Sequence, residues 1–136
     1  MLLDFQQIPV SRKPNDALAV PAHWARRDAD FQTPVFDVSV ERLREAVVKI
    51  ASGEPRTHLV HLDKEASQAE FEQTTRWLRF RDVITVAFEA VDGGAGLAIY
   101  SRARVGYYDF GVNRRRVRRW LDALEAALPR AAERAA

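Results

Sequence analysis

Residues 83–105, VITVAFEAV-DGGAG-LAIYSRARV, have the pattern of a long β-hairpin. Apolar residues alternate along Val83–Val91 and again along Leu97–Val105, which predicts two strands that each turn one face toward a core. Between them, Asp92–Gly96 contains Asp-Gly and Gly-Gly pairs, which supply the positive φ angles of tight turns. The predicted inner face carries Ile84, Val86, Phe88 and Ala90 from the first strand, and Leu97, Ile99, Ser101, Ala103 and Val105 from the second.

One amphipathic helix is predicted before this hairpin and one after it. The first covers about 40–52, because Ser39 is a natural N-cap, apolar residues recur at helical spacing from Val40, and Gly53 provides a stop. The second begins near Asn113 and ends near Leu128, before a proline. Its apolar stripe consists of Val117, Trp120, Leu121, Leu124 and Leu128.

Shorter runs of β-formers complete the element order. Val35–Val38 precedes the first helix, Thr57–Leu62 and Glu70–Phe80 follow it, and Arg81-Asp82 is expected to be a turn. The order strand–helix–four strands–helix predicts an α+β fold, with one antiparallel sheet of about five strands and both helices on one face. It is similar to the TATA-binding-protein-like fold, or to a helix-grip fold that lacks a piece, and implies no DNA binding. The expected core holds Leu43, Val47, Ile84, Val86, Phe88, Trp120, Leu121 and Leu124.

Length and composition predict one domain over residues 1–136. Prolines recur through the first 34 residues, so 1–33 is expected to be an extended arm lying on the domain, 34–128 the core and 129–136 a tail. The chain has no cysteine, which excludes disulfides and thiolate chemistry. No apolar run approaches the roughly 20 residues of a membrane span, and the N-terminus lacks the pattern of a signal peptide. We therefore expect a cytoplasmic protein.

Charge is concentrated near the C-terminus. Residues 101–120 hold seven arginines and one aspartate, whereas the whole chain has a net charge of only +2. Five of these arginines fall in the first turns of the last helix, where positive charge opposes the helix dipole. On a helical wheel Arg114 lies near the apolar stripe and Arg116 flanks it, so we expect Arg114 to need an anion or a carboxylate partner, preferably Asp109, with Asp82 and Glu89 as alternatives. The cluster is therefore either an anion-binding surface or a network of structural salt bridges.

A second group of basic residues is expected on the sheet. Arg102 and Arg104 share the parity of Tyr100, on the face opposite Leu97 and Ile99, which is the arrangement of a polar binding surface or of an ordinary solvated face. We expect no metal site, because His58 and His61 are three residues apart on a strand and so point to opposite faces. No catalytic constellation is evident from residue spacing.

Three segments resemble a bacterial family catalogued as domain of unknown function 1499. Residues 101–117, SRARVGYYDFGVNRRRV, are similar to its Ser-Arg-x-Gly-Tyr/Phe-x-Asp-x-Gly-x-Asn-Arg pattern. Pro14-Asn15 resembles its Pro-Asn element, and residues 77–83, WLRFRDV, resemble its Phe-x-Asp-Asp-Val junction. Two departures are visible: Asp16–Ala19 stands where the family has Cys-Val-Ser-Ser, and Arg81 replaces one of the paired aspartates. The resemblance implies no known reaction or ligand.

The leading functional hypothesis is a non-enzymatic binding or interaction module whose partner is an anionic small molecule or an acidic protein surface, with no cofactor. The alternative is an enzyme acting on an anionic small molecule at the same place, with Asp109 as the acid–base group. Nucleic-acid binding ranks below both, because the net charge is small and no recognition module is evident. The oligomeric state stays open. The predicted ligand-binding residues are Arg102, Arg104, Tyr108, Asp109, Asn113 and Arg114.

Overall fold

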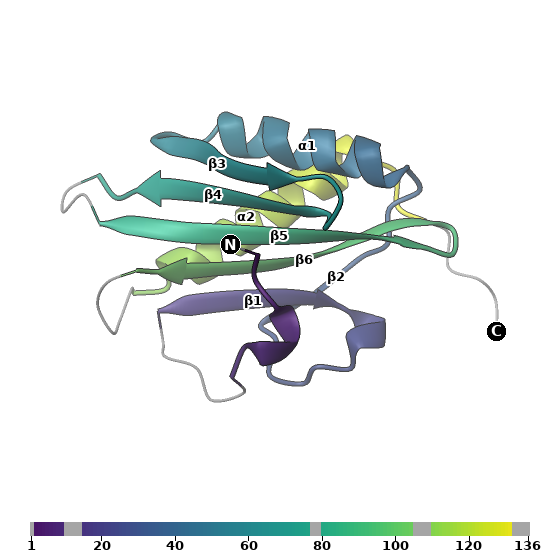
Figure 1. Cartoon of the computed structure of the whole chain (residues 1–136), viewed down its shortest axis with the longest axis horizontal. Helices are drawn as coiled ribbons and strands as arrows, with labels where there is room; N and C mark the ends of the chain where they lie inside the picture. The colour runs from purple at the N-terminus through teal and green to yellow at the C-terminus, as the bar shows by residue number, and fades with distance from the viewer. Residues whose placement is uncertain (1, 10–14, 77–79, 105–109, 132–136) are drawn as a thin grey trace.

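One six-stranded sheet with two helices forms the molecule (Figure 1). The structure, a computed structural model, describes residues 2–9, 15–76, 80–104 and 110–131. The strand order is β2-β1-β6-β5-β4-β3, and only β1 and β2 pair in parallel. The strands are β1 (Asp16–Pro21), β2 (Phe31–Thr33), β3 (Thr57–Asp63), β4 (Gln68–Thr74), β5 (Arg81–Val91) and β6 (Gly94–Ala103). The helices are α1 (Val40–Ser52) and α2 (Val112–Ala127), with two short 3-10 turns, η1 (Phe5–Gln7) and η2 (Ala22–Trp24).

The β5–β6 hairpin is confirmed, with a tighter turn than its five-residue linker suggests. Val91 pairs with Gly94, so Asp92 and Gly93 alone make the turn. Gly93 adopts a φ of 88°, which a residue without a Cβ accepts at little cost. The predicted alternation is confirmed at Ile84, Val86, Leu97 and Ile99, which are fully buried, but Ala90 near the end of β5 is exposed. Val105 lies outside the described residues.

Both helices cover the same face of the sheet. The Ser39 side chain accepts a hydrogen bond from the Arg42 backbone N–H and caps α1, as predicted. Leucine, valine and tryptophan side chains from α1 and α2 share one core cluster with the inner face of β5 and β6. All eight predicted core residues are buried there: Leu43, Val47, Ile84, Val86, Phe88, Trp120, Leu121 and Leu124. No helix in the described part of the chain is both long enough and apolar enough to cross a membrane.

The N-terminal region differs from the predicted irregular arm, because it supplies β1 and β2 and raises the strand count to six. These strands also make the sheet mixed rather than purely antiparallel. β1 is buried on both faces: Ala17 and Ala19 join the helix-side core, whereas Leu18 and Val20 join a cluster on the other face. A strand buried on both faces has a continuous apolar run and no polar alternation. The surrounding prolines and the lack of polar alternation are the reasons why β1 was not predicted from the sequence.

The face of the sheet opposite the helices is partly covered by the first residues of the chain. Phe5 and Ile8 pack on Leu18, Val20 and Ala98, and Figure 1 shows η1 on the near side of the sheet with α2 behind it. The guanidinium of Arg26 donates to the carbonyl oxygens of Phe5 (3.1 Å), Ile8 (2.6 Å) and Pro9 (3.0 Å). The side chain of Arg26 thus holds this segment against the sheet.

Three further details of the strands also differ from the prediction. Residues 35–38 form no strand, and Phe36 makes only isolated bridges to Ala95 and Arg130. β4 ends at Thr74, several residues before the predicted Phe80. Arg81 and Asp82 lie inside β5, because they pair with Thr74 and Gln73 of β4 instead of forming a turn.

Candidate functional site

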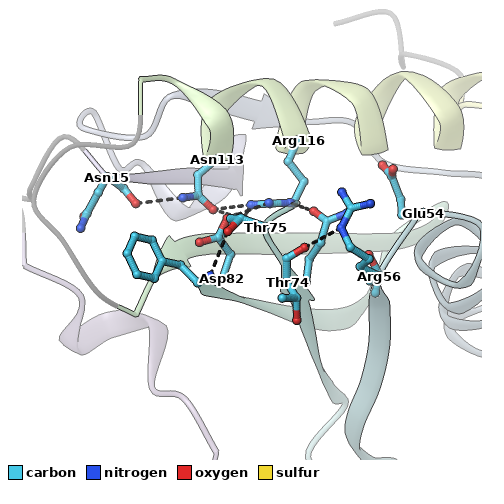
Figure 2. A network of polar contacts seen from close by, with 12 residues as sticks. Asn15, Glu54, Arg56, Thr74, Thr75, Asp82, Asn113 and Arg116 are labelled. Carbon is cyan, nitrogen blue, oxygen red and sulfur yellow. Dashed lines mark hydrogen bonds and ion pairs between the residues drawn. The ribbon is translucent and has the colours of Figure 1, made fainter. Parts of the chain in front are cut away.

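A buried polar cluster surrounds Arg116 near the start of α2 (Figure 2). One terminal nitrogen of its guanidinium donates to the Asp82 carboxylate at 2.8 Å, and its Nε donates to Oε1 of Gln73 at 2.5 Å. The other terminal nitrogen donates to Oδ1 of Asn113 at 2.6 Å and to the Ser101 hydroxyl at 3.1 Å. Arg116 on α2 therefore contacts β4, β5 and β6 at once.

Asn113 connects this cluster to the beginning of β1. Its Oδ1 accepts a hydrogen bond from the Ser101 hydroxyl at 2.6 Å, and its Nδ2 donates to the Asn15 carbonyl oxygen at 3.0 Å. Ser101 and Asn113 are both fully buried, so water cannot replace these partners. The amide of Asn113 consequently orients both the first turn of α2 and the chain before β1.

The chemistry of the Arg116 cluster is that of a structural clamp. Burial lowers the pKa of Arg116, while the nearby Asp82 carboxylate acts in the opposite direction and keeps the guanidinium charged. No buried side-chain nitrogen or oxygen in the described residues lacks a hydrogen-bond partner. Buried polar groups that are hydrogen-bonded to one another hold α2 on the sheet, and this is the role that the contacts of the cluster indicate.

The buried arginine is Arg116. Arg114, expected near the apolar stripe and in need of a carboxylate or anion, does pair with a carboxylate, but at the surface. The Arg114 side chain is 59% exposed, and its Nη1 lies 2.9 Å from Oδ1 of Asp30. On this flank of α2 the guanidinium carbon of Arg114 lies over the ring of Phe31 in β2, which is an edge strand of the described sheet. The opposite flank faces the interior strands, and the long Arg116 side chain reaches them. The preferred partner Asp109 lies outside the described residues.

An arginine groove, formed by Arg114, Arg115, Arg118, Arg119, Phe31 and Asp122, lies on the exposed side of α2 and has a volume of about 420 Å³. The guanidinium carbons of Arg114 and Arg118 lie 5.0 Å and 5.1 Å from the centre of the Phe31 ring, within the range of cation–π interactions. Arg118 and Arg119 also make ion pairs, at 2.9 Å with Asp122 and 2.7 Å with Glu54. Arg115 donates to the Phe110 carbonyl oxygen at 2.9 Å.

Arg102 and Arg104 lie on the sheet face opposite α2, as their parity predicts. Arg102 stacks on the Tyr100 ring at 4.9 Å and donates to the Thr85 hydroxyl at 3.2 Å, and burial lowers its pKa. Arg104 is half-exposed and lies 3.4 Å from a Glu72 carboxylate oxygen. The structure therefore separates the predicted site residues: Arg102 and Arg104 are on the outer face, Asn113 is buried inside, and Arg114 is in the arginine groove. Tyr108 lies outside the described residues, as Asp109 does.

The two histidines of β3 share a face, contrary to the prediction. A bulge at Val60 adds one residue to the strand, so His58 pairs with Glu72 and His61 with Glu70, two positions of equal parity. Even so, the described residues contain no group of three or more His, Asp or Glu side chains arranged to hold a metal ion.

Sequence reasoning missed Arg116, Gln73 and Asn15 as members of one cluster, although it named Asp82 as a possible partner. One available signal was Ser101, a polar residue that lies between Ile99 and Ala103 on the inner face of β6. A buried hydroxyl requires a hydrogen-bond partner. Asn113 is likewise a polar residue at an inward position, because it lies on the apolar stripe of α2. Gln73 and Asn15 carried no comparable signal, because only the sheet topology brings them close.

The cluster draws on each of the three segments that carried the family resemblance. Asn15 comes from the first, Asp82 from the second, and Ser101, Asn113 and Arg116 from the third. No curated protein matches the chain. The sequence profile of a family described as a protein of unknown function, DUF1499, matches residues 9–124. Because this match spans most of the chain and includes the whole clamp, the protein belongs to the DUF1499 family.

Proposed function

We propose that the protein is a non-enzymatic binding module that holds an anionic group in the arginine groove. The observation that carries this proposal is the convergence of four guanidinium groups, at positions 114, 115, 118 and 119, on one open groove of about 420 Å³. Residues at these spacings share a helix face, and guanidinium groups bind carboxylate and phosphate oxygens through parallel hydrogen bonds. An anionic small molecule or an acidic protein segment fits this chemistry.

An incoming anion can displace the carboxylates that pair with Arg114 and Arg118. Arg114 and Arg118 are 59% and 46% exposed, and exposed ion pairs are worth about 0–1 kcal/mol. A phosphate or carboxylate ligand can therefore compete with Asp30 and Asp122 at small cost. Arg115 has no carboxylate partner among the described residues and is the first guanidinium available to an incoming anion.

The groove favours binding over catalysis. Its one acidic lining residue, Asp122, is 64% exposed and paired with Arg118. General acids and bases usually lie in buried positions, whereas this carboxylate is exposed and held by an arginine. The groove therefore supplies mainly positive charge that can orient an anion.

The test is calorimetric titration of inorganic phosphate, citrate and a glutamate-rich peptide into the wild-type protein and the Arg115→Gln variant. Arg56→Gln is a matched control, since Arg56 is exposed and, like Arg115, donates to a backbone carbonyl oxygen, that of Thr74, but precedes β3 and does not line the groove. We expect at least one anion to bind the wild type and the control, and to bind Arg115→Gln about tenfold more weakly, as expected for the loss of one charge-assisted hydrogen bond. Equal affinities for all three proteins, or no binding at low salt, would refute the proposal.

A further inference from the structure

We infer that the anionic partner is the surface of an anionic lipid bilayer, approached by the end of the molecule at which α2 begins. This inference rests on the proposed function, because Arg114 and Arg115 of the arginine groove belong to the first turn of α2. The inference adds exposed apolar side chains outside the groove to the positive charge that the groove provides for membrane binding.

Two exposed phenylalanines provide that contribution. Phe110 is 78% exposed and directly precedes the αL residue Gly111 that begins α2, and Phe80 is 43% exposed directly before β5. The other large apolar side chains exposed in the described residues, Leu2, Leu59 and Val60, are aliphatic. An exposed phenyl ring near basic side chains can insert into the interface of an anionic bilayer.

Both phenylalanines lie at one end of the sheet. Phe80 precedes Arg81, whose carbonyl oxygen accepts from the Arg104 backbone N–H at 3.1 Å, just past the end of β6. The Ser101 hydroxyl on β6 bonds to Asn113 in the first turn of α2, three residues after Phe110. Figure 1 shows this end at the left, where β6 ends and β5 begins.

Exposed arginines accompany each phenylalanine: Arg81 directly follows Phe80, and Arg115 donates to the Phe110 carbonyl oxygen. Arg81, Arg104 and Arg114 have side chains 62%, 53% and 59% exposed, and Arg115 is exposed beside Phe110. Their described carboxylate partners are Glu72, shared between Arg81 and Arg104, and Asp30. Four arginines therefore face two carboxylates, and each basic residue near an anionic leaflet raises affinity about fivefold.

The aromatic geometry favours a bilayer over nucleic acid. Single-stranded nucleic acids stack their bases on open aromatic faces along a basic groove. In the arginine groove, however, the Phe31 ring is occupied by the guanidinium groups of Arg114 and Arg118. On the outer sheet face, the Tyr100 ring is likewise occupied by Arg102. The exposed rings of Phe80 and Phe110 instead stand at turns, where insertion into an interface needs no groove.

The experiment is co-sedimentation with vesicles of phosphatidylcholine alone and of phosphatidylcholine mixed with phosphatidylglycerol. It uses the wild type, Phe110→Ser and Phe80→Ser, with Leu59→Ser as the control because Leu59 is 42% exposed, on the edge strand β3. Thermal unfolding first establishes that each variant is folded. We expect binding only to the anionic vesicles, about tenfold weaker for Phe110→Ser, as expected when a phenyl ring is kept from an apolar environment, and unchanged for Leu59→Ser.

Parallel titration with inorganic phosphate separates this inference from the proposed function. Phosphate binding that needs Arg115, without any vesicle binding, would overturn the bilayer inference and leave the proposed function standing. The absence of both would overturn both. Vesicle binding that is equal in Phe110→Ser and the wild type would contradict the insertion of this ring. Tighter binding to a single-stranded oligonucleotide than to anionic vesicles at the same salt would assign the surface to nucleic acid instead.

Discussion

Arg116 and Asp82 form an ion pair at 2.8 Å in which the two side chains are only 3% and 4% exposed. The pair joins the second turn of α2 to the start of β5 across the helix–sheet interface. The guanidinium meets Gln73, Ser101 and Asn113 at the same time, so its charge and its donors are satisfied together. This relationship explains how a helix with five arginines in its first turns remains docked on an apolar sheet.

Removing the guanidinium should destabilise the fold strongly. We expect Arg116→Met to lower the free energy of unfolding by about 3–5 kcal/mol, because Asp82 would remain as a buried and uncompensated charge. Arg114→Met is the matched control and should cost less than about 1 kcal/mol, since its pair with Asp30 is exposed. Urea denaturation measures both variants. Similar losses in the two proteins would contradict the assignment of Arg116 as the clamp.

The contribution of Arg116 should not depend on pH near neutrality. Burial lowers its pKa in the folded state, so the cost of burying the charge is fully present below that pKa and is relieved only as pH rises through it toward the unfolded value. Arginine stays protonated far above neutrality. The stability difference between the wild type and the double variant Arg116→Met/Asp82→Asn, which leaves no buried carboxylate behind, should therefore be constant between about pH 6 and pH 9. Urea midpoints across this range test the prediction, and a drift above about 1 kcal/mol would show another titrating group coupled to the pair.

Local patterns predicted the parts of the fold that are decided locally. The alternation around Ile84 and Leu97, the Ser39 cap and the apolar stripe around Trp120 each depend on neighbours within a few residues, and the structure confirms them. β1 was not predicted because its pairing with β6 joins residues eighty or more positions apart. The bulge at Val60 was not predicted for a related reason. Only the pairing with β4 shows the extra residue that places His58 and His61 on one face.

The candidate site was predicted less well because charge density along a sequence does not say which flank of a helix the sheet covers. Arg114 and Arg116 lie on opposite flanks of the same apolar stripe, and both are long enough to reach a partner. Sheet order decides between them, since β2 at the edge leaves Arg114 in solvent while β4, β5 and β6 enclose Arg116. The ligand-binding roles proposed for Arg102, Arg104, Asn113 and Arg114 stay predictions.

The hydrogen bonds from Arg26 to the N-terminal segment predict that loss of this side chain destabilises that segment alone. Arg26→Ala removes the donors to the Phe5, Ile8 and Pro9 carbonyl oxygens, so residues 2–9 should detach while the helix-side core stays folded. We expect faster amide hydrogen exchange at Ile8 and a stability loss of about 2–3 kcal/mol, as for charged hydrogen bonds. The neighbouring Arg27 is exposed, and Arg27→Ala should change neither quantity. Protection that persists in Arg26→Ala would show that the packing of Phe5 on Leu18 suffices alone.

Two adjacent glycines of the β5–β6 hairpin should respond very differently to the same substitution. A Cβ at Gly94 would lie 1.8 Å from the Phe36 carbonyl oxygen, which accepts the Ala95 backbone N–H at 2.9 Å, and φ there is 155°. Backbone atoms on both sides leave little freedom to relax, so Gly94→Ala should cost about 3–5 kcal/mol through overpacking and strain. At Gly93, no atom lies within 4 Å of such a Cβ, and Gly93→Ala should cost only the αL penalty of about 1–2 kcal/mol. Urea denaturation compares the two variants. Equal losses would mean that the bridge between Phe36 and Ala95 yields to the added methyl group, and that turn conformation alone limits substitution at this hairpin.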